Sequence, residues 1–229
     1  MTPQLPLALR WPAHQTFDEF LTNADNALAL AAVREVAMET APWVFLSGPA
    51  ASGKTHLLIA ACVAANQAGR SAQYLPLATL SADRESAIRA FGGSDLLAVD
   101  NLETIAGDHA AEHALFDLYN RCRADHATLL FAASHAPPQL DLGLPDLQSR
   151  LAACAQVTLR ALDENERREL VRDRAAVRGI ELDDAVLDWL FIHQARDLAS
   201  LNELLDRIDT AALAAKRRVT VPFLRQLLG

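Results

Sequence analysis

The eight residues GPAASGKT, at positions 48–55, constrain the fold of this chain more than any other stretch. They follow a short run of β-branched and aromatic residues, WVFLS, and precede a stretch with the composition of a helix. A G-x-x-x-x-G-K-[ST] loop between a strand and a helix is a phosphate-binding arrangement. Its glycines let the backbone curl so that successive N–H groups face a phosphate, and the helix N-terminus adds its positive end. The sequence therefore predicts an α/β protein that binds a nucleotide.

The side chains of this loop have separate expected tasks. Lys54 is expected to neutralise oxygens of the β- and γ-phosphates, and Thr55 to offer its hydroxyl to Mg²⁺. Asp100 ends the apolar run DLLAVD and is the expected partner of that ion. The predicted nucleotide-binding residues of the loop are Gly48, Pro49, Ala50, Ala51, Ser52, Gly53, Lys54, Thr55 and His56.

An amide, Asn101, follows Asp100 at a position where hydrolytic enzymes often carry the acid that activates water. An amide cannot accept a proton from water and so cannot serve as a general base. The sequence therefore predicts tight nucleotide binding with slow intrinsic hydrolysis. Two interpretations of Glu103 stay open: it replaces the missing base, or it is solvated where the strand ends.

Strand and helix patterns alternate along the first two thirds of the chain. Apolar residues at helical spacing or in short runs predict helices near residues 24–38, 54–68, 84–91 and 110–124, and strands near residues 43–48, 72–77, 95–100 and 127–134. Strands separated by helices of this length specify a parallel sheet that is covered on both faces.

From residue 160 the strand patterns stop. Asp163 and Glu166 form a capping-box pattern that opens a helix, and Gly179 is placed to close it, with three further helices expected after it. The expected organisation is a flexible, proline-containing arm at residues 1–13, a nucleotide-binding α/β domain at residues 14–158 and a small helical domain at residues 159–229.

Composition disfavours several other classes of protein. The net charge is −8, and residues 1–158 hold nine basic and 16 acidic residues, which argues against sequence-specific DNA binding through a broad basic face. Apolar runs are shorter than the roughly 20 residues of a membrane span and the start does not resemble a signal peptide, so a cytoplasmic protein without membrane contact is expected. Three cysteines without C-x-x-C spacing support neither a disulfide framework nor a zinc site. His109, Glu112 and His113 lack the H-E-x-x-H order and are expected to be solvated helix residues.

Longer stretches resemble the AAA+ ATPases, and within them the DnaA-related group that includes the Hda regulators. The resemblance runs nearly end to end, through TFDEF at residues 16–20, FDLYNR at 116–121, LGLPDLQSRL at 142–151 and VTVPFLRQLL at 219–228. It implies an AAA+ P-loop fold in which helices sandwich a parallel sheet and a small all-helical lid domain follows. It also implies that the TFDEF segment, with Phe17, packs near the adenine of a bound nucleotide.

The resemblance gives roles to two arginines. Arg150 stands where the group carries an arginine finger, which acts in trans on a neighbouring subunit's γ-phosphate. Without the resemblance, an ion pair with Asp146 on one helical face would be favoured. Arg196 matches sensor 2, which reaches the phosphates from the lid; the alternative is an ion pair or a solvated side chain. At the first sensor the group often has an acid two residues before Pro-Pro, whereas residues 134–138 read SHAPP.

The arm contains QLPLAL at residues 4–9, which resembles the hexapeptide with which Hda proteins dock on the sliding clamp, the β subunit of DNA polymerase III. The resemblance implies that Gln4 forms a hydrogen bond at the rim of a pocket on the clamp. Leu5, Leu7 and Leu9 then bury their side chains in that pocket. An idle extended arm is the alternative.

The resemblance implies a negative regulator of the initiation of chromosome replication. Such a protein holds ADP or ATP with Mg²⁺, docks on the DNA-loaded clamp and stimulates ATP hydrolysis by DnaA through Arg150, with little ATPase activity of its own. Self-association as a homodimer is expected because AAA+ subunits act at interfaces. An autonomous loader or motor ATPase and a DnaA-binding scaffold stabilised by its nucleotide stay open as alternatives. A direct initiator is not expected, because no DNA-reading domain follows the lid.

Overall fold

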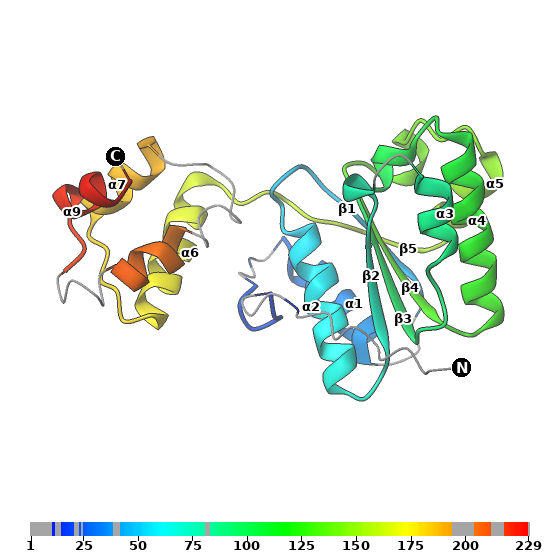
Figure 1. Ribbon diagram of the computed structural model, residues 1–229, viewed down its shortest axis with the longest axis horizontal. Helices are drawn as coiled ribbons and strands as arrows, with labels where there is room; N and C mark the ends of the chain where they lie inside the picture. Colours follow the sequence, from blue (N-terminus) through cyan, green and yellow to red (C-terminus); the bar gives the residue numbers. More distant parts are fainter. Residues whose placement is uncertain are drawn as a thin grey trace. The chain divides into compact units, whose positions relative to one another are not determined.

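The computed structural model describes residues 11, 15–20, 23, 25–38, 42–80, 83–193, 204–211 and 218–228. It divides into two compact units, residues 1–161 and 162–229, drawn from blue to yellow-green and from yellow to red in Figure 1. The segment QLPLAL and Arg196 lie outside the described residues.

The first unit is built on one five-stranded sheet. Its strands are β1 (Val44–Ser47), β2 (Ala72–Pro76), β3 (Leu96–Asp100), β4 (Thr128–Ala133) and β5 (Ala155–Thr158), in the order β2-β3-β4-β1-β5. All pairings are parallel, which confirms the predicted parallel sheet. Four of the strands were predicted. β5 was not, because it is a short edge strand with a single buried side chain, Val157.

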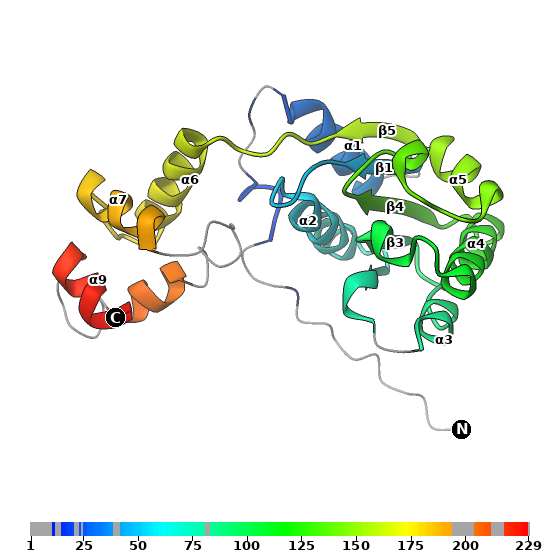
Figure 2. The same cartoon turned by 90° about the horizontal axis from the view of Figure 1, so that it is seen from above.

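Helices cover both faces of the sheet, as the alternation of strands and helices predicted (Figure 2). One layer consists of α1 (Ala27–Met38) and α2 (Lys54–Gln67), and the other of α3 (Arg84–Arg89), α4 (His109–Ala124) and α5 (Pro145–Ala152). Three single turns of 3-10 helix, η1 (Leu77–Thr79), η2 (Leu102–Ile105) and η3 (Pro137–Gln139), follow β2, β3 and β4.

The continuous apolar strands supply both layers of the core, because successive side chains of a strand point to opposite faces. Phe45 and Phe131 are fully buried on the side of α3, α4 and α5, where their rings stack 6.4 Å apart. Leu46 and Leu130 are fully buried on the side of α1 and α2. Burial of each such side chain stabilises the folded state by about 1.5–3 kcal/mol. Packing on both faces therefore holds the sheet between the two helical layers.

The second unit is all-helical. It contains α6 (Glu164–Val177), α7 (Asp184–His193), a helical stretch at residues 204–211 and α9 (Val221–Leu228). The predicted capping box is confirmed, because Asp163 Oδ1 accepts from the Glu166 N–H at 2.9 Å and Glu166 Oε2 accepts from the Asp163 N–H at 2.7 Å. Gly179 follows α6 with a left-handed φ of 72°, the conformation expected of a residue that ends a helix. The small core of the unit includes Leu187, Leu190, Ile208 and Leu224.

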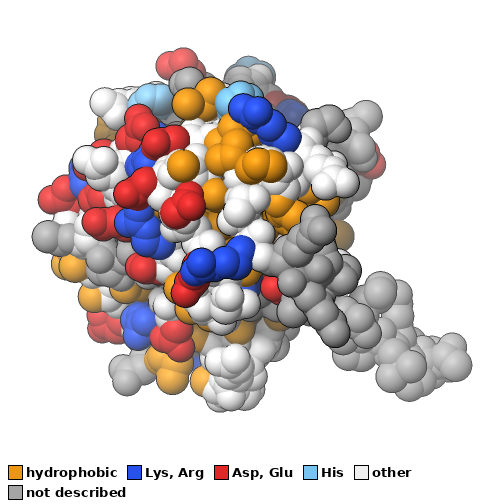
Figure 3. Space-filling view, turned by 90° about the vertical axis from the view of Figure 1, so that its left-hand side faces the viewer, with side chains coloured by type: hydrophobic (Ala, Val, Ile, Leu, Met, Phe, Trp, Pro, Cys, Tyr) orange, Lys and Arg blue, Asp and Glu red, His pale blue; other side chains and the backbone are white. Residues whose placement is uncertain are grey.

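Charges of both signs are interspersed on the molecular face drawn in Figure 3. In the helical unit many of the arginines are paired with acids, for example Arg168 with Asp188 at 2.5 Å and Arg172 with Asp184 at 2.6 Å. A broad basic face is therefore not seen in this view. Within the described residues, no helix is both long enough and apolar enough to span a bilayer.

Candidate nucleotide-binding site

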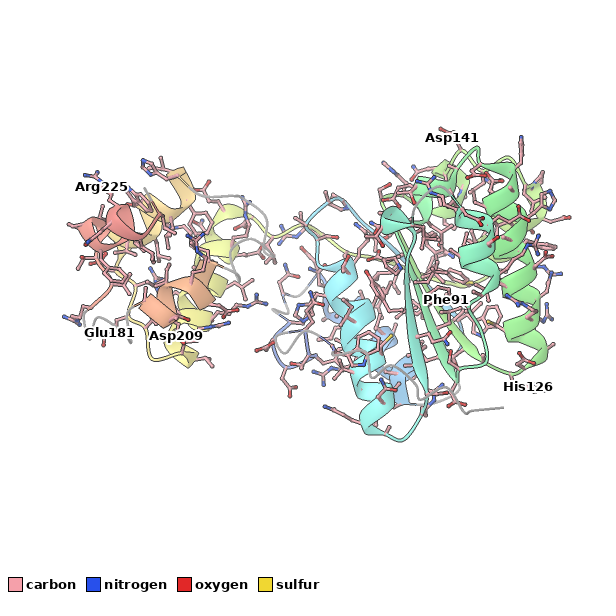
Figure 4. The ribbon with its side chains drawn as sticks, in the orientation of Figure 1. Phe91, His126, Asp141, Glu181, Asp209 and Arg225 are labelled. Carbon is pink, nitrogen blue, oxygen red and sulfur yellow. The ribbon has the colours of Figure 1, made fainter. Side chains whose placement is uncertain are left out.

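The candidate site lies where the strands of the α/β unit end. In Figure 4, Asp141 marks the end of this unit at which the strands finish, and His126 marks the opposite end, just before β4 begins. The carboxyl ends of parallel strands meet at one edge of a sheet, which is where ligands bind in open α/β folds. The loop of residues 48–53 follows β1 at this edge and leads directly into α2.

The loop approaches its surroundings too closely for larger residues at its two glycines. A Cβ atom at Gly53 would lie 2.7 Å from Cε2 of Phe20, and a Cβ at Gly48 would lie 2.6 Å from the carbonyl oxygen of Leu159. Gly53 also caps α2 with a left-handed φ of 95°, and Ala51 has a positive φ of 59°. The curl that the motif predicted is therefore present, and it depends on the absence of side chains at both glycines.

Lys54 occupies the inside of this curl. Its Nζ donates to the carbonyl oxygens of Gly48 at 2.7 Å and Pro49 at 2.8 Å, and its residue is only 8% exposed. Burial lowers the pKa of Lys54, while the negative charges of Glu103 and Asp100 oppose that shift. The charged Lys54 amine is therefore held inside the loop. The two nearby acids are Asp100, which ends β3, and Glu103, which follows it.

The loop also contains a polar atom without a partner. The Ser52 hydroxyl is buried, and no group in the described part of the chain forms a hydrogen bond with it. Buried polar atoms in folded proteins nearly always have a partner, so an exception calls for an explanation such as a catalytic role or a bound ion. A hydroxyl of this kind, beside curled backbone and a lysine, fits an anionic group such as a phosphate.

Asp100 is the centre of a hydrogen-bond cluster at the end of β3. Its buried carboxylate accepts from the Thr55 hydroxyl at 2.6 Å and the Tyr74 hydroxyl at 2.8 Å, both at Oδ2, and from the Asn101 N–H at 2.9 Å at Oδ1. Because Thr55 gives its proton to Asp100, the lone pairs of its oxygen stay available to a cation. This donor set fits Mg²⁺ bound together with phosphate oxygens, the arrangement that uses few protein ligands. No group of three or more His, Cys, Asp or Glu side chains suited to a metal is found among the described residues.

Sequence reasoning missed Tyr74. A tyrosine in the run AQYLPL can equally be an exposed residue of a strand. The sequence alone does not specify that β2 lies beside β3. The strand order brings the two together, since Pro76 pairs with Asp100 in the register of the sheet.

Asn101 has a backbone role that the sequence did not reveal. The residue is left-handed, with φ 59° and ψ 47°, immediately before η2. Asn adopts this conformation more readily than other residues with a Cβ, apart from Asp. An amide at this position therefore suits the sharp exit from β3, whatever its effect on hydrolysis.

Glu103 is half-buried and bonded within the protein, so it is more than a solvated residue at a strand end. Its Oε2 accepts from the Ser134 N–H, just after β4, at 3.1 Å, and its charge opposes the lowering of the Lys54 pKa by burial. The Ser134 hydroxyl in turn lies 3.0 Å from Nδ1 of His135. The carboxylate of Glu103 therefore bridges the ends of two neighbouring strands next to the loop.

The TFDEF segment packs on the start of α2. His56 Nε2 lies 2.7 Å from the carbonyl oxygen of Thr16, and the rings of Phe20 and His56 meet edge to face with centroids 5.5 Å apart. Phe17 instead lies beneath the Arg34 guanidinium, 5.1 Å from its Cζ. Phe20, which sequence reasoning did not select, is thus the aromatic residue of this segment that contacts the loop.

Arg150 lies on α5, with its guanidinium over the ring of Tyr119 and its Cζ 5.8 Å from the ring centroid. Within the described residues, it forms no ion pair with Asp146, so the structure does not contain the pair that the i, i+4 spacing favoured. Arg150 is partly exposed. The other predicted binding residues, Arg196 and Gln4, Leu5, Leu7 and Leu9, lie outside the described residues.

Glu112, expected to be solvated, is fully buried, so that expectation is wrong. Its carboxylate accepts from the N–H groups of Gly107 at 2.8 Å, Gly143 at 3.0 Å and Leu144 at 2.7 Å. Leu144 directly precedes α5. Glu112 therefore ties α4 to the start of the helix that carries Arg150.

Comparison with known proteins identifies relatives of both units. The family model of the bacterial DnaA ATPase domain matches residues 12–160, and that of the Hda lid domain matches residues 163–228. Domain III of the Thermotoga maritima replication initiation protein DnaA is similar in structure, with 20% identity, a TM-score of 0.74 and coverage of 95% of this chain and 97% of that chain.

Two further solved structures have the same fold. A replication initiator DnaA bound to AMPPCP and single-stranded DNA has 20% identity, a TM-score of 0.69 and coverage of 91% of this chain and 70% of that chain. The RuvB Holliday junction branch migration motor of Thermotoga maritima has 19% identity, a TM-score of 0.63 and coverage of 95% and 72%. These likenesses confirm the predicted AAA+ fold with its helical lid. The match to the bacterial DnaA ATPase domain spans well over half of the residues of this chain. The chain therefore belongs to the DnaA ATPase-domain family, as an Hda-like, DnaA-related AAA+ protein.

Proposed function

We propose that this protein is a negative regulator of replication initiation that binds an adenine nucleotide and stimulates ATP hydrolysis by DnaA. In this proposal the nucleotide, ADP or ATP with Mg²⁺, stays mostly intact in the protein's own site. The protein docks on the DNA-loaded sliding clamp through residues 4–9 and supplies Arg150 to the site of ATP-bound DnaA.

The loop and the Asp100 cluster support the nucleotide part of the proposal. Lys54 and the unpartnered Ser52 hydroxyl would hold phosphates, and Thr55 with Asp100 would hold Mg²⁺. Bound Mg²⁺ would neutralise phosphate charge. Arg196 would reach the phosphates from the lid, and the segment with Phe17 would lie near the adenine.

The state of Arg150 is the observation that carries the regulatory part. A guanidinium that forms no ion pair with the nearby Asp146 keeps its charge available for a partner's phosphate, and the ring of Tyr119 supports it without neutralising it. An arginine supplied in trans to a transferring phosphoryl group contributes about 10³–10⁵ in rate in well-studied cases.

The test measures hydrolysis of ATP bound to DnaA in the presence of clamp loaded on DNA. Wild type is compared with Arg150→Ala and with a variant that lacks residues 1–10. Both variants should lose the stimulation while they still bind ADP. Arg123→Ala is the matched control, because Arg123 is an exposed arginine in the last turn of α4 and should be neutral. Full stimulation by Arg150→Ala would refute the proposed mechanism.

Glu103 favours a second candidate, an autonomous AAA+ ATPase. A carboxylate fixed by the Ser134 N–H beside the loop is suited to accept a proton from water, a role that the Asn101 amide cannot fill. Single-turnover hydrolysis of ATP by the purified protein separates the candidates. Rapid turnover that Glu103→Gln abolishes would support the motor, whereas slow turnover in both proteins would support the regulator.

A further inference from the structure

We propose that Tyr74 is a positioning residue that weakens the hold of the nucleotide site on its divalent cation, by occupying a lone pair of Asp100. This inference rests on the proposed nucleotide-binding role of the site. It concerns how strongly the bound nucleotide depends on the metal, which the phosphate-binding motif itself does not determine.

The geometry at Asp100 shows an almost saturated carboxylate. A carboxylate offers about four lone-pair positions. Thr55 and Tyr74 both donate to Oδ2, at 2.6 and 2.8 Å, and the Asn101 N–H donates to Oδ1 at 2.9 Å. Asp100 is completely buried, so these three hydrogen bonds are shielded from bulk water. Of its three donors, the Tyr74 hydroxyl is the one that belongs neither to the phosphate-binding segment nor to the backbone beside Asp100.

The fold delivers the Tyr74 hydroxyl to Asp100 from a neighbouring strand. Tyr74 pairs with Ala98 in the parallel register of β2 and β3, and Asp100 lies two residues further along β3. The phenol is long enough to bridge that diagonal separation. Its ring packs against the core cluster on the α2 side of the sheet, which includes Leu58 and Cys62. Packing of the ring therefore fixes the direction in which the hydroxyl points.

The hydroxyl affects a cation in two ways. It fills an acceptor position that a metal ion, or a water bound to the metal, would otherwise use. It also draws negative charge from the carboxylate, because hydrogen bonds to charged groups stabilise them by roughly tenfold or more in equilibrium constant. With the Tyr74 hydrogen bond in place, the Asp100 carboxylate is therefore a weaker ligand for a cation at the Thr55 hydroxyl. Without that bond, the same carboxylate would bind the cation more strongly.

The experiment measures Mn²⁺ affinity of the full-length protein with ADP, from the free-ion signal in electron paramagnetic resonance. Tyr74→Phe keeps the ring and removes the hydroxyl, and it should tighten Mn²⁺ binding about threefold to tenfold. Tyr119→Phe is the matched control, because Tyr119 is the other of the two tyrosines and lies in the core cluster on the opposite face of the sheet. Its Mn²⁺ affinity should equal that of wild type.

ADP affinity in EDTA gives a second readout. It should be the same in wild type and Tyr74→Phe, because the hydroxyl acts on the metal and not on the phosphates. Unchanged or weaker Mn²⁺ binding by Tyr74→Phe, with normal ADP binding, would overturn this inference and leave the proposed function intact. Absence of ADP binding by wild type, with or without Mn²⁺, would overturn the nucleotide site and this inference with it.

Discussion

The hydroxyl of Thr55 lies 2.6 Å from Oδ2 of Asp100, which joins the first turn of α2 to the end of β3. The two residues come from different strand–helix units, and the proposed Mg²⁺ site needs both of them. The hydrogen bond therefore holds the start of α2 and the end of β3 in fixed positions relative to each other.

Removing this hydroxyl should separate metal binding from phosphate binding. Thr55→Ala leaves the loop backbone and Lys54 in place but deletes the oxygen proposed to bind the cation. We expect ADP affinity in Mg²⁺ to fall about tenfold, the scale of a hydrogen bond to a charged group, with little change in EDTA. Isothermal titration in both buffers checks this, and Thr79→Ala is the control because the Thr79 hydroxyl donates locally, to the carbonyl oxygen of Pro76. Equal losses in both buffers would contradict a role through the metal.

Gly53 should tolerate no side chain. In Gly53→Ala the new Cβ meets the Phe20 ring at 2.7 Å, in addition to the strain of φ 95°. Gly69→Ala is the matched control, since its φ is also positive, 80°, but nothing lies within 4 Å of the added atom. Left-handed strain costs about 1–2 kcal/mol, and overpacking adds roughly 1–3 kcal/mol. Chemical denaturation should therefore show a clearly larger loss of unfolding free energy for Gly53→Ala, and equal losses would contradict the close packing of Phe20 on the loop.

The strength of local patterns explains how much the sequence predicted. The loop, Asp100 and the helix opened by Asp163 were all predicted, because each depends on a short motif whose physical reason lies within a few residues. The strand β5 was missed because edge strands need few apolar residues, and only Val157 of its four residues is buried.

The residues whose roles the sequence did not reveal have long-range partners. Tyr74, Glu103 and Glu112 all act across the fold, on partners 26 to 32 residues away in the chain. Their partners follow from strand order and from the path of loops, which no spacing in a single sequence specifies. From the sequence, Glu112 is expected to be a polar residue on the surface of a helix. In the structure, the loop before α5 covers it.

Glu112 should be the most sensitive acid of the α/β unit outside the nucleotide site. Glu112→Ala leaves three backbone N–H groups, those of Gly107, Gly143 and Leu144, without their acceptor. Gly107 and Gly143 are exposed residues, so water can solvate part of what is lost, whereas the Glu112 carboxylate itself is buried. A hydrogen bond to a charged group contributes about 1.5–3 kcal/mol, so a loss of about that size in unfolding free energy is expected. Asp117→Ala on the same helix removes an exposed ion pair with Arg89 and should cost less than about 1 kcal/mol. Urea unfolding curves of similar midpoint for the two variants would refute the anchoring role of Glu112.

The three buried thiols should make the protein less stable at alkaline pH. Burial raises the pKa of Cys62 to about 12, of Cys122 to about 11 and of Cys154 to about 12, from an ordinary value near 9. Between about pH 9 and these values the unfolded chain loses thiol protons that the folded chain keeps. The unfolded state then binds fewer protons, so the free energy of unfolding falls as pH rises, by up to about 1.4 kcal/mol per thiol for each pH unit in that window. Stability from this source is fully present below pH 9.

Urea midpoints measured from pH 8 to 10.5 should show this decline in stability, and Cys62→Ala should make the decline with pH less steep. Rapid reaction of the native thiols with Ellman's reagent at pH 8 would contradict it, because thiols buried in the folded core should react only after unfolding.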